Sequence, residues 1–304
     1  MKGLIIGYGS IGVRQEQVLQ DLGYEVAIVS RRKIMHEKVY HNLKEAITSF
    51  MPELIIIANE TSKHLSTLNE IQNSPYKGKI LVEKPLFQFY TDTVQDNNSS
   101  IYVGYNLRFN PMILKLKHYL VDEKICNVSF YVGQCLPMWR KNYLQSYSSS
   151  TALGGGVLRD LSHELDLCNW LFGDWESLTS LGGNSTSLKI ESEDQYSILL
   201  QSKKCNLIQI HMNFLNKVFR REIIINTHEN TYEIDLNQKK ITKNGKTEQF
   251  NFDHNTPYEN QIRDITSEKK VMACTFKEAI AVVNMIEKIE FANKEKIWVY
   301  NQLV

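Results

Sequence analysis

Three glycines near the start of the chain constrain its fold most. Gly7, Gly9 and Gly12 follow the apolar run Leu4–Ile6 and precede a helix predicted over Ser10–Leu22. They form a GxGxxG motif at a strand-to-helix junction. In this setting Gly7 makes the turn, Gly9 lets a pyrophosphate approach the backbone, and Gly12 lets the helix pack on the strand.

The start of this helix predicts a site for the phosphates of a dinucleotide. Its first N–H groups, including those of Ser10 and Ile11, have no acceptor within the helix, and its positive end favours an anion. The alternative is a simple tight turn. The strand–helix–strand setting, about thirty residues long, favours the dinucleotide.

The end of the second predicted strand bears on which dinucleotide binds. An acidic residue roughly 20 positions after the motif would accept hydrogen bonds from a ribose 2′-hydroxyl. Here the chain reads Ser30-Arg31-Arg32-Lys33, with no acid. A cationic loop that carries a hydroxyl suits a 2′-phosphate, so NADP is favoured over NAD. The alternative is a solvated basic turn.

The first third of the chain alternates strand and helix. A second helix is predicted over Ser62–Ile71, with Thr61 as its N-cap, and the polar stretch Asp96–Ser100 predicts a loop. This order predicts an α/β fold with a doubly wound parallel sheet. The predicted strands are short apolar runs, as expected where both faces are covered: Gly3–Gly7, Tyr24–Ser30, Glu53–Asn59, Lys79–Glu83 and Ile101–Tyr105.

Composition argues against several classes of partner. With 35 Lys and Arg against 34 Asp and Glu, the formal net charge is +1, which does not favour nucleic acid or a membrane surface. No apolar stretch reaches the length of a membrane span, and the N-terminus lacks the pattern of a signal peptide. The five cysteines form no CxxC pair, so we expect reduced thiols and a cytoplasmic protein.

Three further motifs carry a family resemblance. They are KILVEKP at Lys79–Pro85, GYNLRFNP at Gly104–Pro111 and GGGVLRDLSHELDLCNWLFG at Gly154–Gly173. These motifs are accompanied by the glycine motif, a capping box at Thr275–Glu278 and a closing strand at Ile297–Tyr300. In this combination the chain resembles the Gfo/Idh/MocA family, the glucose–fructose oxidoreductase and inositol dehydrogenase group. The resemblance implies a Rossmann domain followed by an α+β domain with an open, mainly antiparallel sheet.

The second half of the chain agrees with that expectation. Asn244–Gly245 predicts a hairpin turn. We therefore predict a nucleotide-binding domain over residues 1–105 and a substrate-binding and oligomerisation domain over 106–304. In the family the open sheet often forms an interface, which implies a homodimer or homotetramer. The strand-like segments are Val128–Cys135, Ser197–Leu200, Asn206–Phe214, Glu222–Asn226 and Thr231–Leu236.

Lys84 is the first candidate catalytic residue. It follows a predicted parallel strand, at the edge where open α/β sheets bind ligands. In the family the matching lysine contacts the substrate and the nicotinamide ribose; the alternative is a surface lysine. The resemblance also places Asn59 and Glu83 at the cofactor, and Asn106 and Arg108 at the substrate.

The second candidate is His163, which can take the substrate hydroxyl proton as hydride leaves carbon. Asp160, His163 and Glu164 have the i, i+3, i+4 spacing of one helix face, and a carboxylate there can orient the imidazole. In the commoner family pattern the acid lies four positions before the histidine, where this chain has Arg159. Asp160 and Glu164 both stay open as the partner acid.

An aromatic segment, Leu136–Ser150, precedes the glycine-led histidine segment. Its side chains Trp139, Tyr143 and Tyr147 suit stacking on a sugar ring, and Arg140 suits a phosphate or carboxylate. The alternative is a loop that packs on the sheet. With SHELD, which adds Glu164 as a substrate contact, the segment resembles a subgroup associated with bacterial surface-sugar pathways.

These residues predict an NAD(P)-dependent oxidoreductase that acts on a sugar, amino sugar or sugar-phosphate. A non-enzymatic NADP(H) sensor with the same fold is the alternative, although a sensor need not keep Lys84 and His163. No metal is expected, because the sequence His163-Glu164 lacks the second histidine of HExxH: residue 167 is Leu.

Overall fold

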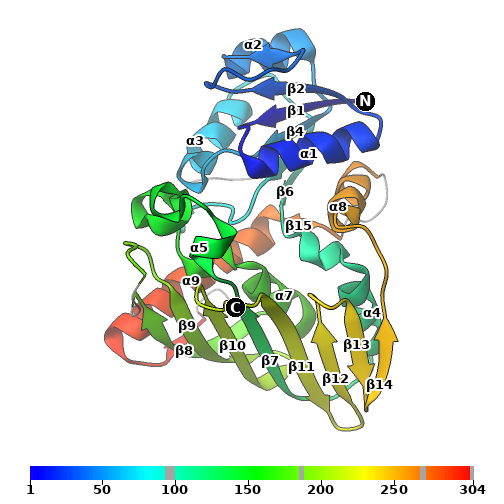
Figure 1. Cartoon of the computed structure of the whole chain (residues 1–304), viewed down its shortest axis with the longest axis vertical. Helices are drawn as coiled ribbons and strands as arrows, with labels where there is room; N and C mark the ends of the chain where they lie inside the picture. Colours follow the sequence, from blue (N-terminus) through cyan, green and yellow to red (C-terminus); the bar gives the residue numbers. More distant parts are fainter. Residues whose placement is uncertain (93–99, 185–187, 268–271, 302–304) are drawn as a thin grey trace. The chain divides into compact units, whose positions relative to one another are not determined.

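The structure is a computed structural model that describes residues 1–92, 100–184, 188–267 and 272–301 (Figure 1). The chain divides into two compact units. The first comprises Met1–Phe109 and His254–Ala281, and the second comprises Asn110–Asp253 and Val282–Val304. Of the predicted loop Asp96–Ser100, all but Ser100 lies outside the described residues.

The first unit contains a seven-stranded sheet in the order β15-β6-β5-β4-β1-β2-β3. All pairs are parallel except β15–β6. The strands are β1 (Lys2–Ile6), β2 (Glu25–Val29), β3 (Val39–Tyr40), β4 (Leu54–Ile57), β5 (Lys79–Val82), β6 (Ile101–Val103) and β15 (Cys274–Thr275). The helices are α1 (Ser10–Asp21), α2 (Leu43–Phe50), α3 (Thr61–Gln72), η1 (Asn106–Phe109), α8 (Thr256–Thr266) and the start of α9 (Phe276–Glu295).

The parallel strands are buried as their sequences predict. All four residues of β4, Leu-Ile-Ile-Ile, are buried, because helices cover both faces of such a sheet. The five strands predicted here and both helices are present, with ends that differ by one or two residues. Thr61 is the first residue of α3 and not its N-cap; Glu60 takes that position without a side-chain cap.

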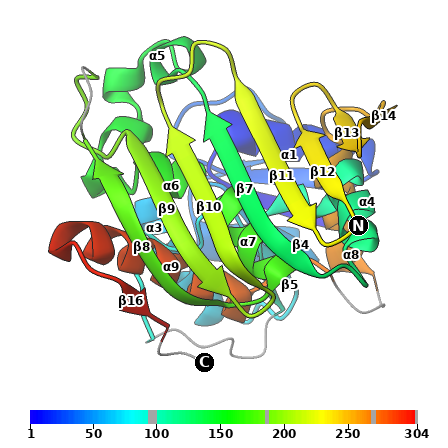
Figure 2. The ribbon, with the colours of Figure 1, turned by 90° about the horizontal axis from the view of Figure 1, so that it is seen from below.

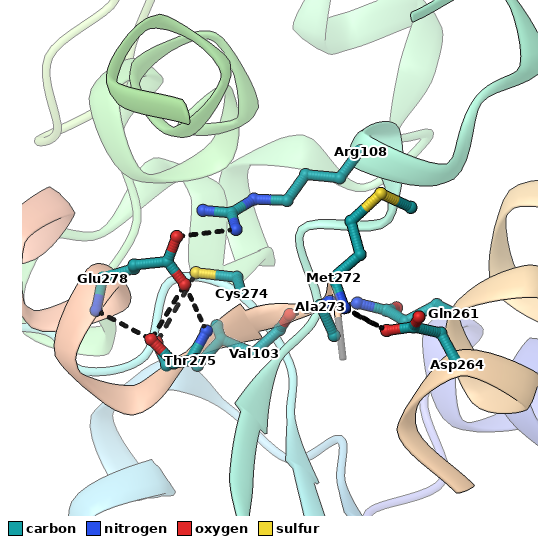
Figure 3. Close-up of polar contacts among 9 residues, drawn as sticks. All are labelled: Val103, Arg108, Gln261, Asp264, Met272, Ala273, Cys274, Thr275 and Glu278. Atoms are coloured by element: carbon teal, nitrogen blue, oxygen red, sulfur yellow. Dashed lines mark hydrogen bonds and ion pairs between the residues drawn. The ribbon is translucent and has the colours of Figure 1, made fainter. Parts of the chain in front are cut away.

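Residues 254–281 belong to the first unit, whereas the sequence predicts them as part of the second domain. There β15 pairs with β6, and Gln261 Nε2 donates to the carbonyl oxygen of Val103 at 3.0 Å. These two contacts join segments more than 150 positions apart, so no local pattern reveals them. Within the returning segment, Asp264 Oδ2 accepts from the amides of Met272 and Ala273 at 2.7 and 2.9 Å (Figure 3).

The second unit contains a nine-stranded sheet in the order β14-β13-β12-β11-β7-β10-β9-β8-β16, in which only β7–β10 is a parallel pair. The strands are β7 (Ile125–Gly133), β8 (Trp175–Gly183), β9 (Gln195–Ser202), β10 (Cys205–Asn213), β11 (Arg220–Thr227), β12 (Thr231–Asp235), β13 (Lys240–Lys243), β14 (Lys246–Gln249) and β16 (Val299–Tyr300). The helices are α4 (Pro111–Tyr119), α5 (Leu136–Trp139), η2 (Tyr143–Gln145), η3 (Tyr147–Ser149), η4 (Thr151–Leu153), α6 (Val157–Asp160), α7 (His163–Phe172) and most of α9.

The two faces of this sheet differ. Burial alternates along β9, where Ile198 and Leu200 are buried and Leu199 is exposed. Helices α6, α7 and α9 lie on one face of the sheet (Figure 2). The predicted fold class, a Rossmann domain and an α+β domain with a mainly antiparallel sheet, is confirmed.

The structure contains the hairpin turn that the sequence predicts in the second half of the chain. Asn244 and Gly245 join β13 and β14 with φ angles of 49° and 79°, the left-handed conformation that a two-residue hairpin needs. Strand β8 was missed, because its sequence WESLTSLGG mixes polar residues and glycines with few apolar ones. Within the described ranges, no helix has the length and apolar character to span a bilayer.

Candidate active site

The glycine loop of the first unit has three positions with three different surroundings. Gly7 has φ +98°, and a Cβ there would lie 2.6 Å from the amide nitrogen of Asn59. A Cβ on Gly12 would lie 2.3 Å from the carbonyl oxygen of Gly7. A Cβ on Gly9 would meet nothing within 4 Å. The fold itself therefore requires glycine at Gly7 and Gly12, whereas at Gly9 it leaves open space.

The N-terminus of the helix that follows this loop has the features of an anion-binding site. Gly9 is the N-cap of α1 and offers no side-chain cap, and no acidic residue lies in the first turn. The amides of Ser10, Ile11 and Gly12 thus lack intrahelical acceptors. With the helix dipole, they favour a phosphate beside Gly9.

The loop after β2 is basic and partly ordered by Ser30. The Ser30 Oγ accepts from the amide of Arg32 at 3.1 Å, and the Ser30 carbonyl oxygen lies 2.7 Å from His41 Nδ1. Both arginine side chains, Arg31 and Arg32, are exposed. Two guanidinium groups are therefore available to solvent or ligand where an NAD-specific loop would carry an acid.

Lys84 lies beside β5, whose end is next to the end of β4. Lys84 is partly exposed, but its neighbour Glu83 is buried and accepts from Gln15 Nε2 at 2.7 Å. Burial raises the pKa of Glu83. Asn59, after β4, donates from Nδ2 to Thr67 Oγ1 at 2.9 Å.

Arg108, predicted to contact substrate, is a buried side chain that pairs with a partly exposed glutamate of the first unit. Its side chain is 2% exposed, and Nη1 lies 3.0 Å from Glu278 Oε1 (Figure 3). Glu278 also closes the predicted capping box, accepting from Thr275 N and Oγ1 at 2.9 and 2.8 Å. Although burial alone would raise it, Arg108 and Thr275 hold the pKa of Glu278 below its ordinary value. Asn106 is buried in the same 3₁₀ turn, η1.

In the second unit, the histidine segment is two helices rather than one. Helix α6 ends at Asp160 and α7 begins at His163. Residues 161 and 162 form a turn, and the amide of Glu164 bonds to the carbonyl of Leu161 at 3.4 Å, three positions back, so the helix is interrupted here. The prediction of one continuous helix face through Asp160, His163 and Glu164 is therefore wrong.

Two of the charged residues near His163 have internal partners. Glu164 is buried, and its Oε1 lies 2.8 Å from Arg221 Nε on β11. Arg159, four positions before His163, is 2% exposed and its Nη1 lies 2.5 Å from Glu290 Oε1. Arg159 thus takes a structural role at the position where the family pattern has its acid.

Glu193 is a further charged residue of this region, one that sequence reasoning missed. It lies 3.7 Å from Arg159 Nη1, and its Oε1 accepts from the amide of Leu158 at 3.3 Å. Burial raises its pKa to about 7, against the opposing charge of Arg159. Glu193, Glu290 and Arg221 are distant in sequence from α6 and α7, and no local signal marks them.

The aromatic segment joins three predicted substrate residues. The Arg140 guanidinium stacks over the rings of Trp139 and Tyr147, at 4.4 and 4.7 Å, and its Nη2 donates to Tyr147 Oη at 3.0 Å. Burial raises the pKa of Tyr147, and the negative charge of Asp160 adds to the shift. Asp160 therefore belongs to the same cluster, whereas Tyr143, in η2, is partly exposed.

The predicted residues thus fall into two sets. The first unit contains the predicted cofactor residues together with Lys84, Asn106 and Arg108. The second unit contains the residues of the aromatic segment together with Asp160, His163 and Glu164. Among the described side chains, no group of three or more His, Cys, Asp and Glu residues could hold a metal ion.

Residues 113–236, which run from α4 to the end of β12, match the family model described as the GFO/IDH/MocA C-terminal domain. The resemblance to the Gfo/Idh/MocA family is confirmed. Among curated proteins, none matches this sequence.

Solved structures share the fold of this chain over its whole length. GenD2 from gentamicin A biosynthesis, in complex with NAD, is 18% identical, covers 99% of this chain and 96% of its own, and has a TM-score of 0.84. WlbA dehydrogenase from Bordetella pertussis, with NADH and UDP-GlcNAcA, is 15% identical, with coverage of 100% and 99% and a TM-score of 0.81. A levoglucosan dehydrogenase with NADH is 13% identical, with coverage of 99% and 98% and a TM-score of 0.87. At these identities the likeness establishes the fold.

Proposed function

We propose that this protein is a nicotinamide-dependent oxidoreductase that transfers a hydride between the cofactor and a carbinol or ketone carbon of a sugar, amino sugar or sugar-phosphate. The observation that carries the proposal is the glycine loop. Gly9 alone leaves open space, at the uncapped start of α1, while its two companion glycines are required by the fold. The complexes of GenD2, WlbA and levoglucosan dehydrogenase with NAD or NADH support the same cofactor class.

We favour NADP over NAD because of this chain's own residues. Arg31 and Arg32 are exposed directly after the buried Ser30, and either guanidinium can pair with a 2′-phosphate. The related complexes hold NAD or NADH, so a direct cofactor comparison is the sharpest test.

The catalytic roles follow from side-chain chemistry. A bound nicotinamide accepts or donates the hydride. Neutral His163 takes the hydroxyl proton, since an imidazole has an ordinary pKa near 6.5 and a lysine one near 10.4. The Lys84 ammonium holds the substrate hydroxyl and stabilises the developing alkoxide. Because Glu164 is engaged by Arg221, Asp160 is the remaining candidate for the acid that orients His163.

The aromatic cluster supports a sugar-like substrate. Trp139 is 42% exposed and lies beside the stacked Arg140, so a ring face and a cation are available together. Such a surface suits a sugar ring that bears a polar or anionic group. UDP-GlcNAcA, which is bound in the WlbA complex, is a ligand of that kind. A place in bacterial surface-sugar biosynthesis, in the cytoplasm, fits this substrate class.

We also propose that the nine-stranded sheet mediates a symmetric homodimer or homotetramer. Leu181, Leu199 and Ile224 point away from the buried face and are 67%, 42% and 41% exposed. Apolar side chains on the outer face of one sheet favour an isologous contact between two copies. Light scattering at micromolar concentration should give a multiple of 35.3 kDa, and Leu199→Glu should lower it; a wild-type mass of 35.3 kDa would contradict the proposal.

The function is tested by fluorescence. NADPH and NADH are titrated against the wild type and the Arg31→Ala/Arg32→Ala variant, and NADPH oxidation is then screened against keto-sugars. The variant should lose NADPH affinity by about 1.5–3 kcal/mol per contact and NADH affinity little. Equal losses would reject the NADP assignment. Tight cofactor binding without turnover of any sugar would favour the sensor.

A further inference from the structure

The imidazole of His64 connects two segments at the ligand-binding edge of the first sheet. His64 lies in the first turn of α3 and is 1% exposed. Its Nδ1 lies 3.0 Å from the carbonyl oxygen of Pro85 and 3.2 Å from that of Leu86. Its Nε2 lies 3.2 Å from the carbonyl oxygen of Asn59.

The protonation state of the ring decides which of its nitrogens donates a hydrogen bond. A neutral imidazole carries one N–H donor, and an imidazolium carries two. Burial lowers the pKa of His64, while the three carbonyls oppose that shift. In either form at least one buried N–H···O=C bond crosses from α3 to a neighbouring segment. Such a bond is costly to lose, since no water replaces the donor in a buried site.

The two segments that His64 contacts directly follow two neighbouring strands. Asn59 follows β4, and Pro85 follows β5, whose residues pair in parallel as far as Ile57 and Val82. Asn59 is also the residue whose amide closely approaches Gly7. The ring of His64 therefore lies between the segment that abuts the glycine loop and the segment that follows Lys84. All its polar neighbours are acceptors, so the neutral ring donates to one side only, and a proton on Nδ1, which faces two carbonyls, ties α3 to the segment after Lys84. Helix α3 itself continues directly from the Asn59 segment.

We infer that His64 is a positioning residue that holds the main chain at Lys84 relative to the Asn59 segment. This assignment rests on the proposed function for its catalytic consequence, although the link itself does not. Lys84 immediately precedes Pro85, so loosening the Pro85 and Leu86 carbonyls shifts the point from which the Lys84 side chain extends. A displacement of about 1 Å in such a group can cost on the order of 10²-fold in rate.

The link is tested by amide hydrogen exchange in the full chain. His64→Leu removes both ring nitrogens, and His64→Gln keeps one N–H donor and one acceptor. Leu68→Ala is the matched control, because Leu68 is also fully buried on α3. We expect His64→Leu to raise exchange by about tenfold in segments 57–62 and 84–90 alone, with partial recovery in His64→Gln.

The same exchange pattern in His64→Leu and Leu68→Ala would overturn the inference, because it would make His64 an ordinary core residue. If His64→Leu does not fold, His64→Gln against Leu68→Ala decides in the same way.

Turnover separates this inference from the proposed function. His64→Leu should lower kcat by about tenfold or more while its Kd for NADPH stays within about threefold, and His64→Gln should recover part of kcat. Unchanged kcat would overturn the positioning role. If the wild type turns over no sugar, the proposed function fails, and the exchange comparison still decides whether His64 holds the Lys84 segment.

Discussion

The two units present chemistry in different ways. In the first, most of the candidate binding groups belong to the main chain, with open space at Gly9 and amides at the start of α1, and Lys84 beside the end of β5 adds a side chain. In the second, the candidate groups are side chains, and several nearby charges form ion pairs in which one member is buried, such as Arg159–Glu290 and Glu164–Arg221. A charged residue in a motif therefore says less about function in the second unit than a glycine does in the first.

The largest expected effect tests the side-chain chemistry of the second unit. His163→Ala should lower kcat by roughly 10²–10⁴ with little change in cofactor affinity, because it removes the proposed proton acceptor. Lys84→Met should impair both kcat and KM. The measurement is single-turnover hydride transfer from pH 6 to 10, with His228→Ala, an exposed histidine of the same unit, as control. If His163→Ala keeps its rate and Lys84→Met loses the basic limb, the two roles are reversed.

The next prediction tests the main-chain chemistry of the first unit. Gly12→Ala places a methyl group 2.3 Å from the Gly7 carbonyl oxygen and should destabilise the fold by about 3 kcal/mol. Gly9→Ala has room and should cost less than about 1 kcal/mol, yet weaken NADPH at least about tenfold, because the methyl fills the space that the pyrophosphate needs. Urea unfolding and NADPH titration are measured on both variants. If the Gly9→Ala variant binds NADPH with wild-type affinity, the glycine loop is not part of the cofactor-binding site.

The third prediction concerns Glu193, whose pKa of about 7 is above its ordinary value. Between pH 4.5 and 7 the folded chain keeps a proton that the unfolded chain loses, so stability falls as pH rises through that window. The loss is at most about 3 kcal/mol. Glu193→Gln stays neutral and should narrow the difference in melting temperature between pH 5 and pH 8.

The matched control is Glu191→Gln, at an exposed carboxylate two residues away. It should leave the pH dependence unchanged. An equal effect of the two substitutions would show that the buried Glu193 carboxyl is not the source of the pH dependence of stability.

Features that depend on neighbouring residues could be predicted from the sequence. The glycine loop, the apolar parallel strands, the Asn244–Gly245 hairpin and the Thr275–Glu278 capping box each involve residues a few positions apart, where steric limits and local hydrogen bonds act. The fold class followed from their order along the chain.

Tertiary structure decided what each charge does and where the chain returns. Arg108 meets Glu278 across 170 positions, and Arg159 meets Glu290 across 131, so neither pairing has a local signature. The return of residues 254–281 to the first sheet likewise depends on long-range contacts. Burial sets these outcomes: a desolvated charge must find a partner, and the partner that the fold supplies lies wherever packing brings it.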